Sequence, residues 1–184
     1  MISHENALKF LHQHIQNPNM IKHCLASEAV LRAIALKLNE DSAEWSMAGL
    51  LHDIDVEITH GDPLQHGPYA ARMLDGLLSP EAIDAIVMHN EMATGKERST
   101  VFQHALAAGE TITGLIMATA MVYPDKKLSS VKTKSITKRM KEKAFAASVN
   151  RETILECELI GIPLADFAEL SLGAMQEISD ELGM

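Results

Sequence analysis

Residues 48–55 read AGLLHDID, a run of small and apolar residues that leads directly into His52 and Asp53. A second acid, Asp55, follows two positions later. Charged groups this close to apolar residues of a buried helix cost free energy unless something compensates them. A metal ion can compensate them, because imidazole and carboxylate groups are both metal ligands. The stretch therefore predicts a metal site, provided that the rest of the chain supplies further ligands.

The composition favours a single all-α domain. The chain has 184 residues, enough for one domain whose core needs no disulfide to stabilise it. Hydrophobic residues make up 47% of the sequence but aromatic residues only 4%, so aliphatic side chains, alanine and eleven methionines must fill the interior. The β-branched and aromatic runs that are typical of strands are nearly absent. We therefore expect a single-domain helical bundle over residues 1–184.

The spacing of apolar residues is helical along most of the chain, with Pro, Gly and polar stretches as breaks. It predicts helices over about 4–16, 20–38, 43–52, 68–77, 80–89, 100–121, 129–146, 151–159 and 163–181. The polar stretches 55–67 and 90–99 are predicted to be loops. The sequence shows no internal repeat and no linker between domains.

The net charge and the apolar runs limit the expected partners and location. A formal charge of −9 argues against a nucleic acid polymer as partner. No apolar run approaches the ~18 residues of a membrane span, and the N-terminus, MISHENALKF, lacks the layout of a signal peptide. Cys24 and Cys157 are too few for a disulfide framework and are expected to be buried thiols. We therefore expect a cytoplasmic protein that contacts no membrane.

The chain has nine histidines, and several lie where predicted helices begin or end. The candidate metal ligands are His23, His52, Asp53, His66, His89 and Glu110. Imidazole and carboxylate groups together suit Zn, Mn, Fe or Mg, depending on geometry. Of the other five histidines, His60 lies in the predicted 55–67 loop, and His4, His12, His14 and His104 are expected to be ordinary surface or core residues. As an alternative for the doublet, His52 could serve as a helix C-terminal cation, but Asp53 and Asp55 would then lie at the unfavourable end of the helix dipole.

This pattern resembles the HD superfamily of metal-dependent phosphohydrolases. The stretch IKHCLASEAVLRAIA, with His23, is similar to the helix that carries the family's first histidine, and AGLLHDID is similar to its His-Asp doublet. QHGPYAARML, with His66, and AIVMHN, with His89, resemble the two extra histidines of the subgroup that binds two metals. The resemblance covers about residues 20–123. Residues 124–184 form a C-terminal extension similar to a small bacterial branch of predicted HD hydrolases.

The sequence departs from the family pattern at the last ligand. The family usually has Asp there, in a stretch like AADxLTG, whereas this chain has AAGETITG and places Glu110 at that position. Glutamate can bind a metal at similar distances, but its carboxylate lies one methylene further from the backbone. We expect Glu110 to bind the metal directly or through water, or to weaken the site.

The resemblance implies one or two divalent ions. His23, His52, Asp53 and Glu110 would hold the first, and Asp53 would bridge to a second ion held by His66 and His89. A divalent ion polarises a phosphoryl oxygen and lowers the pKa of water from 15.7 to ~7 in favourable cases. Two ions ~3.5–4 Å apart would clamp an in-line displacement at phosphorus.

Further residues are candidates for catalysis and phosphate binding. Asp55 or Glu57 is expected to act as a general acid or as a base that orients water, since some HD enzymes carry an acid shortly after the doublet. The alternative for each is a solvated loop acid. Eight of the sixteen Lys and Arg residues lie between 126 and 143, opposed there only by Glu142. Lys126 and Lys127 follow the predicted 100–121 helix directly, and we expect them to bind substrate phosphate.

The expected function is hydrolysis of a small phosphoester, such as a nucleotide or a related metabolite. The alternative is a ligand-sensing HD module without turnover, which the Glu110 substitution favours and the retained histidines disfavour. A third possibility is an HD oxygenase, which would need redox iron.

Overall fold

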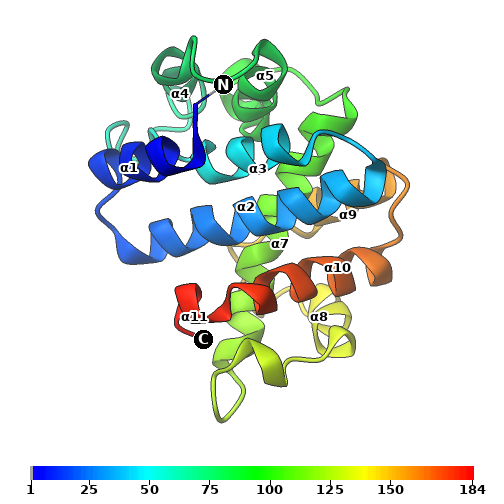
Figure 1. Cartoon of the computed structure of the whole chain (residues 1–184). Helices are drawn as coiled ribbons and strands as arrows, with labels where there is room; N and C mark the ends of the chain where they lie inside the picture. Colours follow the sequence, from blue (N-terminus) through cyan, green and yellow to red (C-terminus); the bar gives the residue numbers. More distant parts are fainter. Residues whose placement is uncertain (1) are drawn as a thin grey trace.

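A computed structural model describes residues 2–184, and the part of the chain that it describes contains helices, turns and no strand (Figure 1). The all-α prediction is therefore confirmed. The α-helices are α1 (His4–His14), α2 (Pro18–Leu38), α3 (Ser42–Leu51), α4 (Pro68–Leu74), α5 (Pro80–His89), α6 (Glu91–Thr94), α7 (Val101–Met121), α8 (Thr133–Met140), α9 (Arg151–Leu155), α10 (Leu164–Glu177) and α11 (Ser179–Leu182). Two short 3-10 helices, η1 (Leu128–Ser130) and η2 (Glu156–Glu158), complete the set.

The two longest helices, α2 and α7, organise the molecule. Figure 1 shows α2 crossing its middle, with α1 and α3 on one side and α10 on the other. Helix α7 runs behind α2 and packs against α2, α3, α5, α8, α9 and α10. Because so many elements meet α7, residues that are far apart in the sequence can reach a common site on it.

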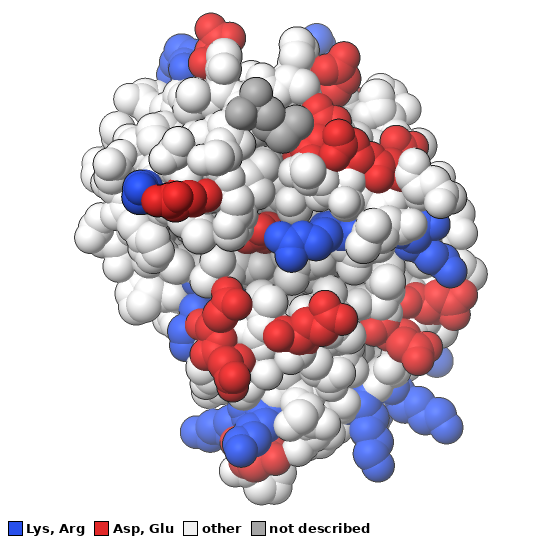
Figure 2. Space-filling view, in the orientation of Figure 1, with Lys and Arg blue, Asp and Glu red and all other residues white. Residues whose placement is uncertain are grey.

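Positive charge gathers at one end of the molecule. In Figure 2, Lys and Arg side chains cluster at the lower end, where Figure 1 places α8 and the chain that precedes it. The cluster belongs to the basic 126–143 segment, which carries half of all Lys and Arg residues. Within residues 2–184 no helix combines the length and the apolar character needed to cross a bilayer.

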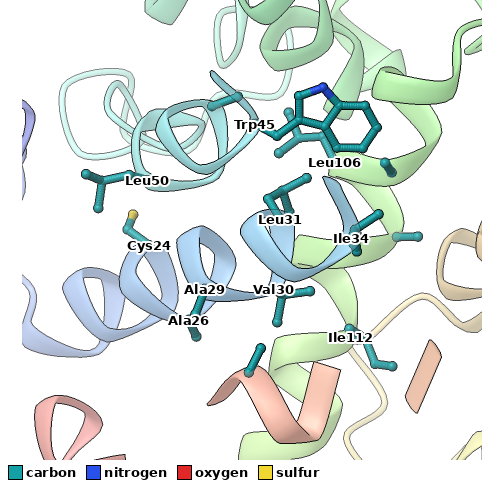
Figure 3. Close-up of a cluster of buried hydrophobic side chains, with 14 of the residues drawn as sticks. Cys24, Ala26, Ala29, Val30, Leu31, Ile34, Trp45, Leu50, Leu106 and Ile112 are labelled. Atoms are coloured by element: carbon teal, nitrogen blue, oxygen red, sulfur yellow. The ribbon is translucent and has the colours of Figure 1, made fainter. Parts of the chain in front are cut away.

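The hydrophobic core lies on both sides of α2. Leu31 and Ile34 meet Trp45 of α3 and Leu106 of α7 on one side, while Ala26 faces the opposite side, toward the C-terminal helices (Figure 3). A helix buried on two faces must be apolar nearly all round, rather than amphipathic. This arrangement holds α3 and α7, which carry much of the site, against a rigid central helix.

The ends of these helices are fixed by side-chain caps. Asn17 caps α2 ahead of Pro18 at its first turn. The Asp41 carboxylate caps α3 by accepting hydrogen bonds from the backbone N–H groups of the two residues that follow Ser42. Thr100 and Gln103 form a reciprocal capping box at the start of α7. Such caps satisfy backbone donors that the helix itself leaves unpaired, and each typically contributes about 1 kcal/mol.

Two glycines let α3 and α7 approach α2 closely. A Cβ atom at Gly49 would lie 2.6 Å from the backbone oxygen of Ser27. A Cβ atom at Gly109 would lie 2.7 Å from a methyl group of Leu31. Gly49 precedes His52 by three residues and Gly109 directly precedes Glu110, so these close approaches set the positions of both metal-ligand candidates.

Two predicted elements differ from the structure. The helix predicted over 129–146 is wrong: the chain forms η1 and α8 and then a run of turns over 141–150. The turns bring Phe145 and Val149 against the core, with Ala146 in the left-handed region at φ 44°. The polar stretch 90–99, predicted as a loop, contains the short helix α6. The other predicted helices hold to within a few residues, apart from η2 after α9 and a break at Ile178 between α10 and α11.

Candidate metal centre

Four histidines from different parts of the chain converge around the carboxylate of Asp53. His23 comes from α2, His52 and Asp53 directly follow α3, His66 precedes α4, and His89 is the last residue of α5. Within residues 2–184, two groups have ligand atoms close enough together to hold metal ions. One is His23, His52 and Asp53, and the other is Asp53, His66 and His89.

Asp53 belongs to both groups and divides its oxygens between them. Its Oδ2 lies 3.5 Å from Nε2 of His23 and 3.4 Å from Nε2 of His52. Its Oδ1 lies 3.2 Å from Nε2 of His66 and 3.4 Å from Nε2 of His89. Each carboxylate oxygen therefore faces one pair of imidazoles, which is the arrangement that a carboxylate bridging two ions requires.

Glu110 lies at the edge of the first group. Its Oε2 is 3.6 Å from Nε2 of His23, and its Oε1 accepts a hydrogen bond from the hydroxyl of Thr111. One oxygen is thus held in place while the other faces the first pair of histidines. The longer side chain of glutamate therefore reaches the site from α7. Its carboxylate lies outside the two groups whose ligand atoms are close enough together to hold an ion.

Each of the four histidines uses its Nδ1 atom to bond a residue outside the cluster. His23 Nδ1 lies 3.0 Å from the hydroxyl of Thr113, His52 Nδ1 2.8 Å from the carbonyl of Gly49, His66 Nδ1 2.7 Å from the carboxylate of Asp55, and His89 Nδ1 within hydrogen-bond reach of the carbonyl of Ile86. Carbonyl and carboxylate oxygens only accept, so Nδ1 must donate to them. The Thr113 hydroxyl donates to the Glu110 carbonyl at 2.6 Å, so it also accepts from His23. Every neutral ring therefore presents an unprotonated Nε2 to the cluster.

The donor set fits a metal ion. The Nε2 atoms of His23 and His52 lie 3.1 Å apart, and in neutral rings two lone pairs would face each other at that distance. Two nitrogens that bind one ion at about 2.0–2.1 Å lie roughly 3 Å apart, so a shared cation removes the repulsion. The Nε2 atoms of His66 and His89 are 2.9 Å apart, a distance that suits a second shared ion. Hydrogen bonds that orient the outer nitrogen of a histidine are typical of metal sites.

Burial and charge act in opposite directions on these groups. Burial lowers the pKa of His52 to about 3, so this ring is neutral. Burial alone would raise the pKa of Asp53, but the histidines around it, His52 foremost, hold it well below its usual range. Burial also opposes the charged form of His66, yet hydrogen bonds to Asp53 and Asp55 raise its pKa to about 10. Without a metal, the His66 proton takes the place that a cation would occupy beside Asp53.

Asp55 does not face the open side of the site. It is fully buried, one oxygen accepts the bond from His66, and the other accepts from the backbone N–H groups of Gly67 at 2.9 Å and Ala70 at 2.8 Å. With both oxygens occupied, Asp55 orients His66 and fixes the start of α4. The catalytic role expected for Asp55 stays a prediction, and these hydrogen bonds favour a positioning role instead.

Glu57 and the two lysines lie away from the cluster. One Glu57 oxygen accepts hydrogen bonds from the backbone N–H groups of Gln16 and Asn17, between α1 and α2. Lys126 and Lys127 line a different cavity, together with residues of the C-terminal segment. Helix α7 continues beyond Glu110 to Met121, a rise of about 17 Å, before the turn that leads to Lys126. Catalysis by Glu57 and phosphate binding by the lysines stay predictions, and the positions of these side chains do not favour them.

Sequence reasoning also missed residues that support the ligands. Thr113 lies three residues after Glu110, on the same face of α7, and this spacing is the signal that could have identified it. Arg98 donates to the carbonyls of Met88 at 2.9 Å and His89 at 3.3 Å, and so holds the end of α5. Its guanidinium also forms a bidentate pair with Glu156, at 2.8 and 2.6 Å. Nothing in the local sequence around Arg98 indicates these distant partners.

A cavity of about 370 Å³ opens beside the cluster. Its inner residues His23, His89 and Glu110 belong to the candidate site, and the rest of its lining is neutral. The neutral lining residues are Thr111, Gly114, Ser148, Val149, Asn150 and Thr153. The cavity gives a small molecule direct access to the ligand cluster.

One comparison with known proteins gives a match. The sequence profile of the HD domain family matches residues 20–121, more than half of the chain, and the matched range contains every residue of the ligand cluster. Neither the curated proteins nor the solved structures contain a significant match. The His-Asp doublet at residues 52–53, with its oxygens divided between two pairs of histidines, lies within the matched range. The chain belongs to the HD domain family.

Proposed function

We propose that the protein is a metal-dependent phosphohydrolase that acts on a small organic phosphomonoester. HD domains are in general metal-dependent phosphohydrolases. The observation that carries the proposal is the position of Asp53 between two pairs of histidines, with one oxygen facing each pair. This arrangement supports a site for two divalent ions, of Mn, Fe, Zn or Mg, rather than for one.

Each residue has a distinct part in this proposal. His23, His52, Asp53 and Glu110 would hold one ion, and Asp53, His66 and His89 the other. A divalent ion bound there supplies Lewis-acid polarisation of a phosphoryl oxygen and lowers the pKa of water. The Nδ1 bonds of the histidines keep the rings fixed, so little reorganisation is needed when substrate binds.

The charge balance at the site favours a single phosphate group. The positive charge of two divalent ions would exceed the combined negative charge of Asp53, Glu110 and Asp55. The site would therefore keep a net positive charge that can bind a phosphate dianion. None of the cavity-lining residues in the described part of the chain is a lysine or an arginine. Enzymes that bind di- or triphosphates commonly use such side chains to match the additional charge. We therefore infer a substrate such as a nucleoside monophosphate or another phosphorylated metabolite.

The first test is metal content. Protein purified without chelator is expected to hold Mn, Fe, Zn or Mg at one to two equivalents by inductively coupled plasma mass spectrometry. The variants His52→Ala and Asp53→Ala should lose it, while circular dichroism shows that they remain helical. A matched control is His12→Ala, because His12 is exposed on α1 and lies outside the cluster.

The second test is turnover. Phosphate release from nucleoside mono-, di- and triphosphates and from sugar phosphates should require added Mn²⁺, Zn²⁺, Fe²⁺ or Mg²⁺ and should be fastest on monophosphates. A metal-loaded protein that releases no phosphate from any of them would contradict hydrolysis and support a sensing module. Oxygen uptake by the iron-loaded form would instead support an oxygenase.

A further inference from the structure

The outer wall of the metal cavity comes from the C-terminal extension. Ser148, Val149, Asn150 and Thr153 line the cavity, and all four lie beyond residue 121, where the match to the HD domain family ends. Three of them belong to residues 141–150, the run of turns between α8 and α9, which we call the mouth loop. A feature of this chain outside the family profile thus faces the metal ligands His23, His89 and Glu110 across the cavity.

Arg151 holds the mouth loop in its conformation. Its guanidinium donates hydrogen bonds to five backbone carbonyl oxygens, which belong to Arg139, Glu142, Phe145, Ala146 and Val149. The bonds to Ala146 and Val149 measure 2.6 and 2.7 Å. A guanidinium that donates its hydrogen bonds to backbone carbonyl groups fixes the conformation of the backbone, and this effect does not depend on the side chains of the loop.

Two further contacts seat the loop. Val149 packs on Gly114 of α7, where an added Cβ atom would lie 3.3 Å from the valine methyl group. Gly114 is one helical turn beyond Glu110, so the loop rests directly beside the ligand cluster. At the other end of the loop, the guanidinium of Arg139 lies 4.2 Å from the centre of the Phe145 ring. We call the five bonds from Arg151 to backbone carbonyl groups the Arg151 clamp. The contacts of Val149 and Phe145 hold the loop on either side of this clamp.

The loop presents neutral polar groups to the cavity. Ser148 offers a hydroxyl, and Asn150 offers an amide whose Oδ1 caps α9 by accepting from the N–H groups of Glu152 and Thr153. Thr153 and Thr111 line the same cavity, and the Thr111 hydroxyl donates to the Glu110 carboxylate. Neutral donors and acceptors of this kind suit the hydroxyl groups of an uncharged leaving group better than additional phosphates.

We infer that the mouth loop, clamped by Arg151, is the substrate-selecting wall of the metal cavity and recognises the hydroxylated leaving group of the phosphomonoester. This inference rests on the proposed function for the identity of the substrate, but the clamp itself can be tested without turnover. Arg151 is a positioning residue, because it acts only through the backbone of the loop.

The first experiment compares Arg151→Met with Arg72→Met. Arg72 is an exposed arginine of α4 that lies over the Tyr69 ring and is not among the residues that line the cavity. Loss of the clamp should speed tryptic cleavage after Lys141 and Lys143 about tenfold or more, because proteolysis follows local opening. It should also speed extraction of bound Mn²⁺ or Zn²⁺ by EDTA, while the metal content before extraction stays at the wild-type level. Unchanged cleavage and extraction in Arg151→Met would overturn the clamp.

A second variant reaches the loop from the other side. Gly114→Val places methyl groups against Val149 and should lift the loop, while Arg151 and every candidate metal ligand are retained. It should reproduce the faster cleavage and extraction, so the inference can still be tested if Arg151→Met fails to fold. Wild-type behaviour of Gly114→Val would contradict the seating of the loop on α7.

Substrate selection is tested on the monophosphates that the wild type hydrolyses. Arg151→Met should raise KM about tenfold or more for substrates with a hydroxylated leaving group and change kcat much less, with Arg151→Lys in between. It should affect p-nitrophenyl phosphate, whose leaving group has no hydroxyl groups that the loop could contact, less than threefold. Equal losses on both substrates would overturn the selecting role. If no phosphoester is hydrolysed, the proposed function fails, while cleavage and metal extraction still decide whether the clamp exists.

Discussion

The Asp55 carboxylate accepts hydrogen bonds from the ring of His66 and from the backbone N–H groups of Gly67 and Ala70. In Asp55→Asn, one oxygen becomes an NH₂ group, and this group must face either two backbone donors or the Nδ1–H of His66. We expect a loss of about 1–3 kcal/mol in the free energy of unfolding, measured in urea with chelator present. Metal affinity should fall about 10–100-fold, as is usual when a partner of a metal-binding histidine is lost.

Asp75→Asn is the matched control, since Asp75 is exposed after α4. It should change the unfolding free energy by less than about 0.5 kcal/mol. Wild-type metal affinity in Asp55→Asn would show that the ring of His66 needs no carboxylate to orient it.

His66 also determines how metal binding responds to pH. Asp53 and Asp55 overcome the effect of burial and raise the pKa of His66 to about 10, so in the metal-free protein this ring is protonated at neutral pH. A metal ion on Nε2 must displace that proton. Affinity for Zn²⁺ or Mn²⁺ should therefore increase about tenfold per pH unit between pH 6 and 8 through this group alone. His52 adds nothing in that range, because its pKa of about 3 leaves it neutral.

The raised pKa of His66 also makes the folding stability of the metal-free protein depend on pH. A pKa that is raised in the folded state stabilises the metal-free protein fully below the unfolded value near 6.5. That stabilisation is lost as the pH rises from about 6.5 through about 10. Competition titrations with a chromophoric chelator at several pH values measure the effect, and an affinity independent of pH would contradict a protonated His66.

At the scale of elements, the contact between α2 and α3 depends on Gly49. An alanine there would place its Cβ 2.6 Å from the backbone oxygen of Ser27 and force the two helices apart. Overpacking of this kind typically costs about 1–3 kcal/mol. The shift would also move the Gly49 carbonyl that orients His52, so metal affinity should fall together with the melting temperature.

Gly173→Ala is the matched control for this change. Gly173 lies within α10, and a Cβ atom there would meet nothing within 4 Å. Alanine should stabilise this helix by about 0.5–1 kcal/mol, because it loses less backbone entropy on folding than glycine does. Differential scanning calorimetry should show opposite shifts for the two variants, and equal shifts would mean that helix propensity, not packing, governs position 49.

The elements that were predicted well are those with strong local signals. Asn17-Pro18, Asp41 and Thr100 mark helix starts by their capping chemistry, and the apolar spacing of α2 and α7 continues over five turns. In the predicted 129–146 helix, local and long-range signals disagree. Its basic residues favour a helix, but its backbone conformation depends on contacts with residues that are distant in the sequence. Arg151 and Gly114 bend residues 141–150 into the mouth loop, and neither contact is visible in the local sequence.

At the scale of the whole molecule, motif spacing predicted the histidines that the structure brings together around Asp53. Nearness in sequence, by contrast, did not predict where Glu57 and the lysines lie. Glu57 is four residues after Asp53, but the chain has turned by then and its carboxylate bonds the backbone of residues 16–17. Lys126 follows α7 directly, yet that rigid helix carries it to the far end of the molecule. Rigid helices separate residues that a loop of the same length could keep together.

Because the candidate ligands come from α2, the end of α3, the segment before α4, α5 and α7, a bound metal should stabilise the entire fold. A ligand present at 100 times its Kd adds about 2.7 kcal/mol to the unfolding free energy if it binds only the folded state. For a chain of this size that corresponds to a rise of about 5–10 °C in melting temperature. Thermal unfolding with and without Zn²⁺ or Mn²⁺ measures the rise, which should vanish in Asp53→Ala and persist in His12→Ala. A rise of the same size in Asp53→Ala would mean that the metal binds elsewhere, and that the convergence of these five segments around one carboxylate is not a metal site.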